Sequence, residues 1–401
     1  MKVVCRFRPL NDFEKQSGDN IDFLIQNNQV KIRTNKKNEQ DYNFSFDYAF
    51  GIDTEQKEVF EVVARPVIEG VFEGWNGTIL AYGQTSSGKT FTMQGAMMNE
   101  RLKGIVPRIV QAIFEHIEDS PEHIEFMVKV SLLEVYMEEV RDLLNPNSKK
   151  KVSIRESPTE GLYIENLSEV CVADSLEVET VIASGNNSRK IGRTNMNAVS
   201  SRSHMVTLVN IMQTNTMENN VKRGKLYLVD LAGSERVAKT GATGDTFNEG
   251  KLINQSLLSL GSVINALTEG NPFIPYRNSK LTRILQESLG GNSRTTLIVT
   301  CSPSRYNESE TISTLQFGVR AKLIKNKARV NEELSREQLI INLEKANAKV
   351  IMLESHVEFL EDHIRKNLKS EVPAFKSASK SDKHDVSALT DAGSKFDPEL
   401  M

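Results

Sequence analysis

Hydrophobic positions follow two different periods along the first 325 residues of the chain. Short apolar runs, such as residues 77–82 (GTILAY) and 224–231 (GKLYLVDL), have the length and composition of buried strands. A longer segment at 105–118 (IVPRIVQAIFEHIE) repeats apolar residues every three or four positions, as amphipathic helices do. This alternation predicts an α/β domain with helices on both faces of a sheet. Further segments of the same kinds are strands at 123–136, 206–213 and 294–302 and a helix at 252–270.

The period changes again after residue 338, where apolar residues follow alternating steps of four and three. This is the heptad spacing of a coiled coil. Mostly β-branched residues at a and mostly leucine at d favour a parallel two-stranded coil, so we expect a homodimer through residues 339–364. The alternative is a single amphipathic helix that folds back onto the globular part. The a positions are Leu343, Val350, Val357 and Ile364, and the d positions are Leu339, Ala346, Leu353 and Leu360.

Composition marks the boundaries between these parts. Residues 322–335 are a charged connector, and the stretch beyond Pro373 is polar and poor in apolar residues, which favours disorder. We therefore expect a globular domain at 1–321, a linker at 322–335, a coiled coil at 336–369 and a disordered tail at 370–401.

Charge and cysteine usage narrow the class of protein. The 401 residues carry a net charge of -3, which lacks the basic signature of nucleic-acid binding. An acidic partner would therefore need a local basic patch. The three cysteines are few and lie far apart in the sequence, which suits free thiols in a reducing cytosol. The sequence contains neither an apolar run near the roughly 20 residues of a membrane span nor a signal-peptide pattern. We expect a cytoplasmic protein with no membrane insertion and no nucleic-acid partner.

The strongest chemical signal is GQTSSGKT at residues 83–90, which matches the phosphate-binding pattern GxxxxGK[ST]. It follows a predicted strand and precedes a segment that can form a helix, which is the context that the pattern requires. The alternative is a flexible turn that matches by chance. Glycines let backbone N–H groups converge on a phosphate, Lys89 reaches the β- and γ-phosphates, and Thr90 offers a hydroxyl to Mg²⁺. The predicted nucleotide contacts here are Gln84, Thr85, Ser86, Ser87, Gly88, Lys89 and Thr90.

Two further segments carry residues suited to sensing a γ-phosphate. The run KLYLVDLAGSE ends a strand at Asp230, which can hold Mg²⁺ through water, and Gly233 completes a DxxG loop. Ser201, in the loop NAVSSRSH, can reach the phosphate and the metal. Alone, each signal is weak, because strands often end in aspartate and serine-rich loops are often only loops. Beside the phosphate loop, the Asp230 signal becomes strong.

Together, GQTSSGKT, NxxSSRSH and DLAGSE resemble the kinesin motor domain in order and spacing. The resemblance extends from CRFRP at Cys5 to about residue 326, and its last segments are most similar to conventional kinesin heavy chains. It implies a P-loop NTPase-type mixed sheet flanked by helices on both faces, followed by a neck linker and a short coiled-coil helix. It also implies ATP and Mg²⁺ as cofactors and microtubules as the partner. The implied activity is a microtubule-stimulated ATPase that drives plus-end-directed movement on the cytoskeleton.

The resemblance also assigns roles to single residues. Arg6, Arg8 and Pro9 match the adenine pocket, with Phe91 as the aromatic ring after the phosphate loop. A flat guanidinium, a proline face and an aromatic ring can sandwich a purine. The first-switch arginine and second-switch glutamate of the family form a salt bridge that orders the attacking water. The implied catalytic group is Ser201, Arg202, Gly233 and Glu235.

The track-binding surface and the linker are implied in the same way. A modest basic surplus between residues 236 and 283 matches the family's microtubule-binding face, although such clusters are usually solvated faces. Ile324 and Asn331 match the docking residues of the neck linker, for which the alternative is a plain hinge. The candidate microtubule contacts are Lys239, Lys251, Arg277, Lys280 and Arg283.

Three departures from the family pattern qualify this interpretation. Gln255 stands where conventional members usually carry lysine, and Asn278 replaces an aspartate. The chain also begins at Met1 without the preceding cover strand, from which we expect a trimmed sequence or weaker force production. Two other classes are compatible with parts of the sequence: a different P-loop enzyme, and a nonmotile microtubule-binding protein with a degenerate site.

Overall fold

The computed structural model describes residues 1–17, 22–33, 41–97, 99–157, 161–191, 200–235, 245–333 and 336–368. The chain divides into two compact units, Met1–Leu334 and Ser335–Met401. The strands are β1 (Lys2–Phe7), β2 (Asp22–Gln26), β3 (Gln29–Arg33), β4 (Tyr42–Ser45), β5 (Tyr48–Phe50), β6 (Gly77–Tyr82), β7 (Ile124–Tyr136), β8 (Glu139–Asp142), β9 (Ser153–Ser157), β10 (Gly161–Glu165), β11 (Val170–Val172), β12 (His204–Asn215), β13 (Asn220–Asp230), β14 (Arg294–Cys301) and β15 (Glu332–Glu333). The α-helices are α1 (Asp12–Ser17), α2 (Gln56–Val63), α3 (Arg65–Phe72), α4 (Lys89–Met93), α5 (Ile105–Glu118), α6 (Ser175–Ile191), α7 (Asp245–Glu269), α8 (Lys280–Ile284), α9 (Glu308–Lys322) and α10 (Arg336–Leu368), and the 3₁₀ turns are η1 (Ser200–Arg202), η3 (Tyr276–Asn278) and η4 (Arg305–Asn307).

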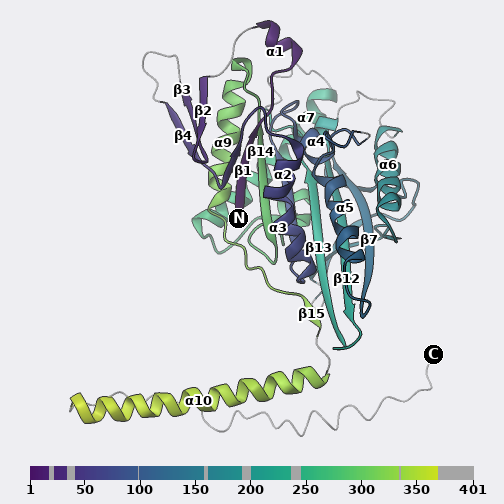
Figure 1. Ribbon diagram of the computed structural model, residues 1–401. Helices are drawn as coiled ribbons and strands as arrows, with labels where there is room; N and C mark the ends of the chain where they lie inside the picture. Colours follow the sequence, from purple (N-terminus) through teal and green to yellow (C-terminus); the bar gives the residue numbers. More distant parts are fainter. Residues whose placement is uncertain are drawn as a thin grey trace. The chain divides into compact units, whose positions relative to one another are not determined.

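A mixed sheet runs through the first unit in the order β11-β7-β12-β13-β6-β14-β1-β5 (Figure 1). Strand β6 pairs in parallel with both β13 and β14, whereas β12 pairs antiparallel with β13 and β7. The register sets Asp230 at the end of β13 opposite Ala81 near the end of β6. The loops that follow these two strands therefore emerge side by side at one edge of the sheet, which is where open α/β sheets bind ligands.

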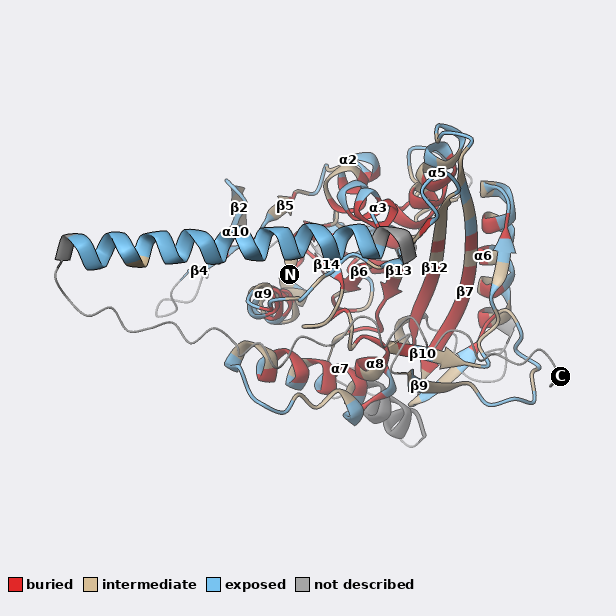
Figure 2. Ribbon diagram, turned by 90° about the horizontal axis from the view of Figure 1, so that it is seen from below, coloured by how far each residue is buried: buried red, intermediate tan, exposed pale blue. Residues whose placement is uncertain are grey.

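Each face of this sheet is covered by its own group of helices. Side chains such as Ile79 pack against α2, α3, α5 and α6, whereas the adjacent Leu80 packs on the other side, against α7, α8 and α9. Successive residues point to opposite faces of a strand, so a strand buried on both faces is apolar along most of its length. Figure 2 shows the central strands buried between the two helical layers. This arrangement confirms the predicted α/β fold class.

Most of the predicted segments correspond to elements of the structure. The run at 123–136 forms β7, and the helix expected at 105–118 is α5. The helix expected from residue 252 begins earlier, at Asp245. The sequence-based prediction did not include helices α2, α3, α6 and α9, the small antiparallel sheet β2-β3-β4 or the hairpin β9-β10. The strands of this sheet and this hairpin have four or five residues, too short for a clear period.

Helix α10 contains the heptad seam, and its described side chains are almost all exposed. Leu343, Val350 and Leu353 are about half exposed, as expected of an apolar seam without a partner. Across the described parts of the chain, every helix is too short or too polar to span a bilayer. The tail expected at 370–401 lies outside the described residues.

Candidate functional site

The phosphate loop joins β6 to α4 and has the backbone shape that its glycines allow. Gly83 has a φ of 153°, and a Cβ atom there would lie 2.3 Å from the carbonyl oxygen of Thr300. Gly88 adopts a φ of 100° just before the helix begins. Both positions require glycine, because a side chain would either clash or be strained. Ser87 anchors the loop to β14, because its hydroxyl lies 2.6 Å from that of Thr300.

Lys89 places its ammonium group inside this loop. The side chain is 6% exposed, and Nζ donates to the carbonyl oxygens of Gly83 and Gln84, both at 2.8 Å. Burial lowers the pKa of Lys89, while the nearby charges of Asp230 and Glu235 act in the opposite direction. A buried cation held by two carbonyl groups is suited to an incoming phosphate, which would supply stronger acceptors.

Thr90 and Asp230 form a pair of oxygen donors beside Lys89. The Thr90 hydroxyl donates to Oδ2 of Asp230 at 2.6 Å, and the other carboxylate oxygen is buried without a hydrogen-bond partner. Burial raises the pKa of Asp230, against the charge of Lys89 and the hydrogen bond from Thr90. An unpartnered buried carboxylate oxygen next to a hydroxyl fits a hard cation such as Mg²⁺. The described residues hold no cluster of three or more His, Cys, Asp or Glu that could bind a metal alone. Magnesium would therefore also need phosphate and water ligands.

The loop after β13 closes onto the phosphate loop. Ser234 donates its backbone N–H to the carbonyl of Gly83 at 3.1 Å, and Gly233 donates to the carbonyl of Ser201 at 2.7 Å. A Cβ atom on Gly233 would lie 2.4 Å from the hydroxyl of Thr85, so a side chain there would displace the contact between Thr85 and Glu235. These bonds bring together Ser201, Gly233 and the phosphate loop, three segments that the sequence predicted to meet.

Glu235 is bound to the phosphate loop in this structure. Its carboxylate accepts hydrogen bonds from the backbone N–H of Thr85, at 2.7 Å, and from the Thr85 hydroxyl. The ion pairs of the described residues do not include one between Arg202 and Glu235, although both residues belong to the described part of the chain. That salt bridge stays a prediction for the nucleotide-bound arrangement.

At the expected adenine corner, Arg6 is held inside the protein. This side chain is only 7% exposed, and its guanidinium donates to Gln56 Oε1 at 2.6 Å and to the Thr92 hydroxyl at 2.9 Å. Burial lowers its pKa to about 10. Arg6 lies 5.6 Å from the ring centroid of Phe91, which is partly exposed. Arg6 therefore supports Phe91 from inside the protein, and its contact with a purine stays a prediction.

Arg8 and Pro9 remain at the mouth of the phosphate loop. The guanidinium of Arg8 donates to the carbonyl of Ser86 at 2.6 Å, and Pro9 is exposed. A partner missed from the sequence is Glu14, whose buried carboxylate pairs with Arg8 at 2.6 Å. Burial opposes its ionisation, but hydrogen bonds from Arg8, the Asn11 backbone and Ser302 hold its pKa at about 2. Glu14 thus fixes the orientation of Arg8.

His204 is a second residue whose role was not predicted, although it lies in the NAVSSRSH segment. It is 2% exposed, and its Nδ1 accepts the backbone N–H of Ala232 at 3.0 Å. Its Nε2 lies 2.7 Å from the hydroxyl of Ser256 on α7. Burial, with the charges of Arg189 and Lys89, lowers its pKa to about 3, so the imidazole is neutral and Nε2 carries the proton. His204 joins the Gly233 loop directly to α7.

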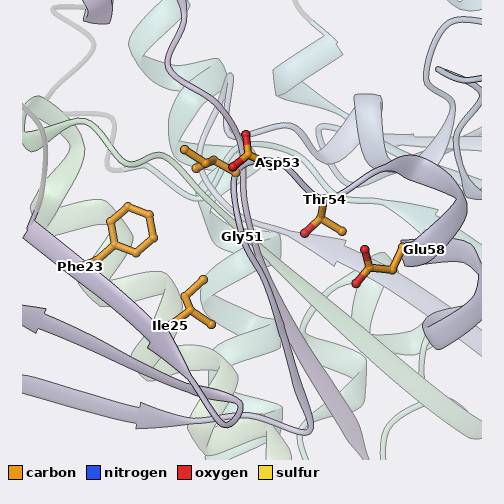
Figure 3. Close-up of a pocket in the computed structure, with 7 residues that line it drawn as sticks. Phe23, Ile25, Gly51, Asp53, Thr54 and Glu58 are labelled. Carbon is orange, nitrogen blue, oxygen red and sulfur yellow. The ribbon is translucent and has the colours of Figure 1, made fainter.

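A shallow cavity of about 410 Å³ lies beyond the adenine corner, between β2 and residues 51–58. Figure 3 shows Phe23 and Ile25 on one side of it and Asp53, Thr54 and Glu58 on the other. The residues predicted to bind nucleotide are not among those that line it. We therefore do not assign this cavity to the nucleotide site.

Residues 323–333 lie along the sheet as an extended, docked segment. Ile324 is 2% exposed in the core beside α9. Asn331 donates its backbone N–H to Gly74 O at 2.8 Å and its side-chain amide to Gly74 O and Asn76 Oδ1, at 2.9 and 3.0 Å. β15 then pairs with the beginning of β13, with Glu333 opposite Val221. The connector is therefore held by a specific set of contacts.

The predicted basic residues are only partly available to a partner. Arg277 and Lys280 are exposed, and Arg283 is paired with Glu156 on β9. Lys239 lies outside the described residues, and only the backbone of Lys251 is described. The charge of Arg283 is thus partly neutralised within the protein.

The sequence profile of the kinesin motor domain matches residues 6–324 of this chain. The chain belongs to the kinesin motor domain family. It is 53% identical to a kinesin heavy chain from Syncephalastrum racemosum over 91% of its own length and 39% of the relative. It is 51% identical to kinesin-related protein 3 of Dictyostelium discoideum, covering 90% of this chain and 30% of the relative.

Two further relatives agree with this membership. Human kinesin-1 heavy chain is 47% identical over 91% of this chain and 37% of its own. The solved structure of a fast kinesin superposes with a TM-score of 0.79 and 48% identity, covering 84% of this chain and 95% of that one. The chain therefore spans about a third of the length of these kinesin heavy chains and almost the whole length of the solved structure.

Proposed function

We propose that this chain is the force-generating part of a microtubule motor, in which ATP hydrolysis controls the docking of residues 323–333 and drives plus-end-directed movement. The observation that carries the proposal is the position of β13. Its last residue, Asp230, lies at the phosphate loop, and its first residues, Val221 and Lys222, pair with the docked linker. One strand thus reaches both the nucleotide site and the mechanical element.

Different residues of the chain have different roles in hydrolysis. Thr90 and Asp230 would hold Mg²⁺, which neutralises phosphate charge during phosphoryl transfer. Lys89 binds the phosphates. Gly233 and Glu235 now bond to Ser201 and Thr85, and they would exchange these bonds for the γ-phosphate and the attacking water. Such an exchange moves the loop that His204 ties to α7.

This proposal makes microtubule stimulation the decisive measurement. Microtubules should raise the steady-state ATPase rate, and added salt should weaken the stimulation because tubulin presents an acidic surface. A different P-loop enzyme would hydrolyse nucleotide at a rate that does not depend on microtubules. A nonmotile binding protein would bind microtubules without turnover.

The exposed cations Arg277 and Lys280 should contribute to microtubule affinity. Replacing both by alanine removes two surface charge contacts of about 0.5 kcal/mol each, so the microtubule concentration for half-maximal ATPase should rise about fivefold. The basal rate without microtubules should stay unchanged. Lys57→Ala, on the helical layer that covers the opposite face, is the matched control. Lys57→Ala removes one charge, so a rise of about twofold in this control would assign the effect to net charge alone.

We also propose that the chain forms a parallel homodimer through residues 339–364. The exposed apolar seam of α10 supports this, because an isolated helix gains little stability without a partner. Leu353→Asp should convert the dimer to a monomer in sedimentation velocity at micromolar concentration. Ser355→Asp places the same charge outside the seam and should leave the dimer intact. If Leu353→Asp also stayed dimeric, the seam would not be the interface.

A further inference from the structure

A cavity of about 570 Å³ lies between the sheet, the hairpin β9-β10 and the docked linker. Leu162 and Tyr163 of the hairpin form one wall, and Arg329 and Asn331 of the linker form another. Its volume falls within the range of roughly 300–1,000 Å³ that is typical of small-molecule sites. The residues that we assign to nucleotide or microtubule binding do not line it.

The floor of the cavity combines methionine side chains with cations. Two rows of residues that lie opposite one another on β7, β12 and β13 form this floor, and each row is called a rung here. Residues paired in register point to the same face of a sheet, so all of these side chains face the cavity. One rung is basic and polar, and the next is largely apolar. The first rung is Lys129, Asn210 and Lys225, and the second is Met127, Met212 and Arg223.

Two of the four cations that line the cavity have carboxylate partners. Lys129 pairs with Glu169 at 3.3 Å, and Arg223 pairs with Glu333 at 3.1 Å. The side chains of Lys225 and Arg329 have no hydrogen bond or ion pair with any residue that the structure describes, and both line the cavity. The remaining carboxylate, Glu287, accepts the backbone N–H of Asn292 at 3.0 Å. The lining therefore carries four cations and three carboxylates, a net charge of +1, and the cations without a partner among the described residues are Lys225 and Arg329.

Tyr227 adds a hydroxyl donor between these charges and the core. It lines the cavity, and its hydroxyl group has no hydrogen-bond partner within the described chain. Burial, together with the charge of Glu287, raises its pKa to about 12. The hydroxyl is therefore protonated at neutral pH and can donate to an anion.

We propose that this cavity is a binding site for an organic anion with an apolar body. The anionic group would meet Lys225, Arg329 and the Tyr227 hydroxyl, and the apolar body would cover Met127 and Met212. Because Arg329 and Asn331 belong to the linker, the site is complete only while the linker is docked. Such a ligand stabilises the docked state by binding it selectively. The inference depends on the docked linker alone and not on the proposed motor activity.

The test uses 8-anilinonaphthalene-1-sulfonate, an apolar aromatic sulfonate whose fluorescence rises on binding. The probe is titrated into the full chain in the presence of a saturating nonhydrolysable ATP analogue, so that the phosphate loop is already occupied. Lys225→Gln should weaken probe affinity about fivefold, the effect of one charge contact near 1 kcal/mol. Asn331→Ala should also weaken it, because it loosens the linker wall. Lys57→Gln, which removes a charge from a distant helix, should bind the probe as the unchanged chain does.

A second measurement reports on the linker itself. Saturating probe should slow trypsin cleavage after Lys327 and Arg329 in the unchanged chain, and less so in Lys225→Gln at the same probe concentration. Tyr227→Phe keeps the ring and loses only the donor, so it provides a weaker-binding variant if Lys225→Gln melts early. Equal affinity in Lys225→Gln, Asn331→Ala and the unchanged chain would overturn the proposal. Complete displacement of the probe by nucleotide would also overturn it, because the probe would then occupy the phosphate loop.

Discussion

Lys89→Ala should abolish measurable ATP turnover, with or without microtubules. The ammonium of Lys89 is buried inside the phosphate loop and is held by two carbonyl oxygens at 2.8 Å. Removing one preorganised group that stabilises transition-state charge costs roughly 10²–10³-fold in rate, and phosphoryl transfer depends almost wholly on such groups. Steady-state ATPase and binding of a fluorescent ATP analogue measure the two consequences separately.

The control must separate lost chemistry from lost folding, because Lys89→Ala leaves Asp230 without its neighbouring cation. Thermal unfolding of the variant shows whether the domain remains intact. Lys57→Ala removes a lysine from an exposed helix position and should retain full turnover. A well-folded Lys89→Ala protein with normal turnover would show that ATP is hydrolysed elsewhere.

Local chemistry explains why the core of this site could be predicted from the sequence. The phosphate loop depends on neighbouring residues, since Gly83 and Gly88 adopt conformations that other residues avoid. Asp230 could be placed beside it because a carboxylate at the end of an apolar strand suits the Mg²⁺ that accompanies a phosphate loop. In the structure, the register of β6 and β13 sets Asp230 opposite Ala81, just before the phosphate loop.

The parts that escaped prediction depend on contacts between distant segments. Arg6 matched a motif, but its partners Gln56 and Thr92 lie 50 and 86 residues away and bury it. Nothing in the sequence marks Glu14 as the partner of Arg8, or Glu156 as the partner of Arg283. A motif gives the residue type and its order, whereas burial and pairing arise from tertiary packing.

The linker combines both cases. Its charged composition predicted a connector, and the family resemblance pointed to Ile324 and Asn331 as docking residues. Its docked path depends on the sheet edge near Gly74 and Asn76, which the linker's own residues do not encode. The same docking completes the cavity above Lys225, so the position of residues 323–333 determines two properties of the protein.

Asn331→Ala should uncouple movement from hydrolysis. The side-chain nitrogen donates to Gly74 O and Asn76 Oδ1 at 2.9 and 3.0 Å, Oδ1 accepts from the side-chain amide of Asn292 at 2.9 Å, and alanine removes all three bonds. At about 1 kcal/mol each, their loss lowers the docked population relative to the undocked one by about a hundredfold. Microtubule gliding velocity should therefore fall several-fold, while microtubule-stimulated ATPase changes by less than about twofold, because the phosphate site is untouched.

Asn43→Ala, at an exposed position on β4, is the matched control and should glide normally. If Asn331→Ala glided at full speed, docking of this segment would not be the source of movement. A parallel loss of ATPase would instead place Asn331 in the coupling that closes the nucleotide site.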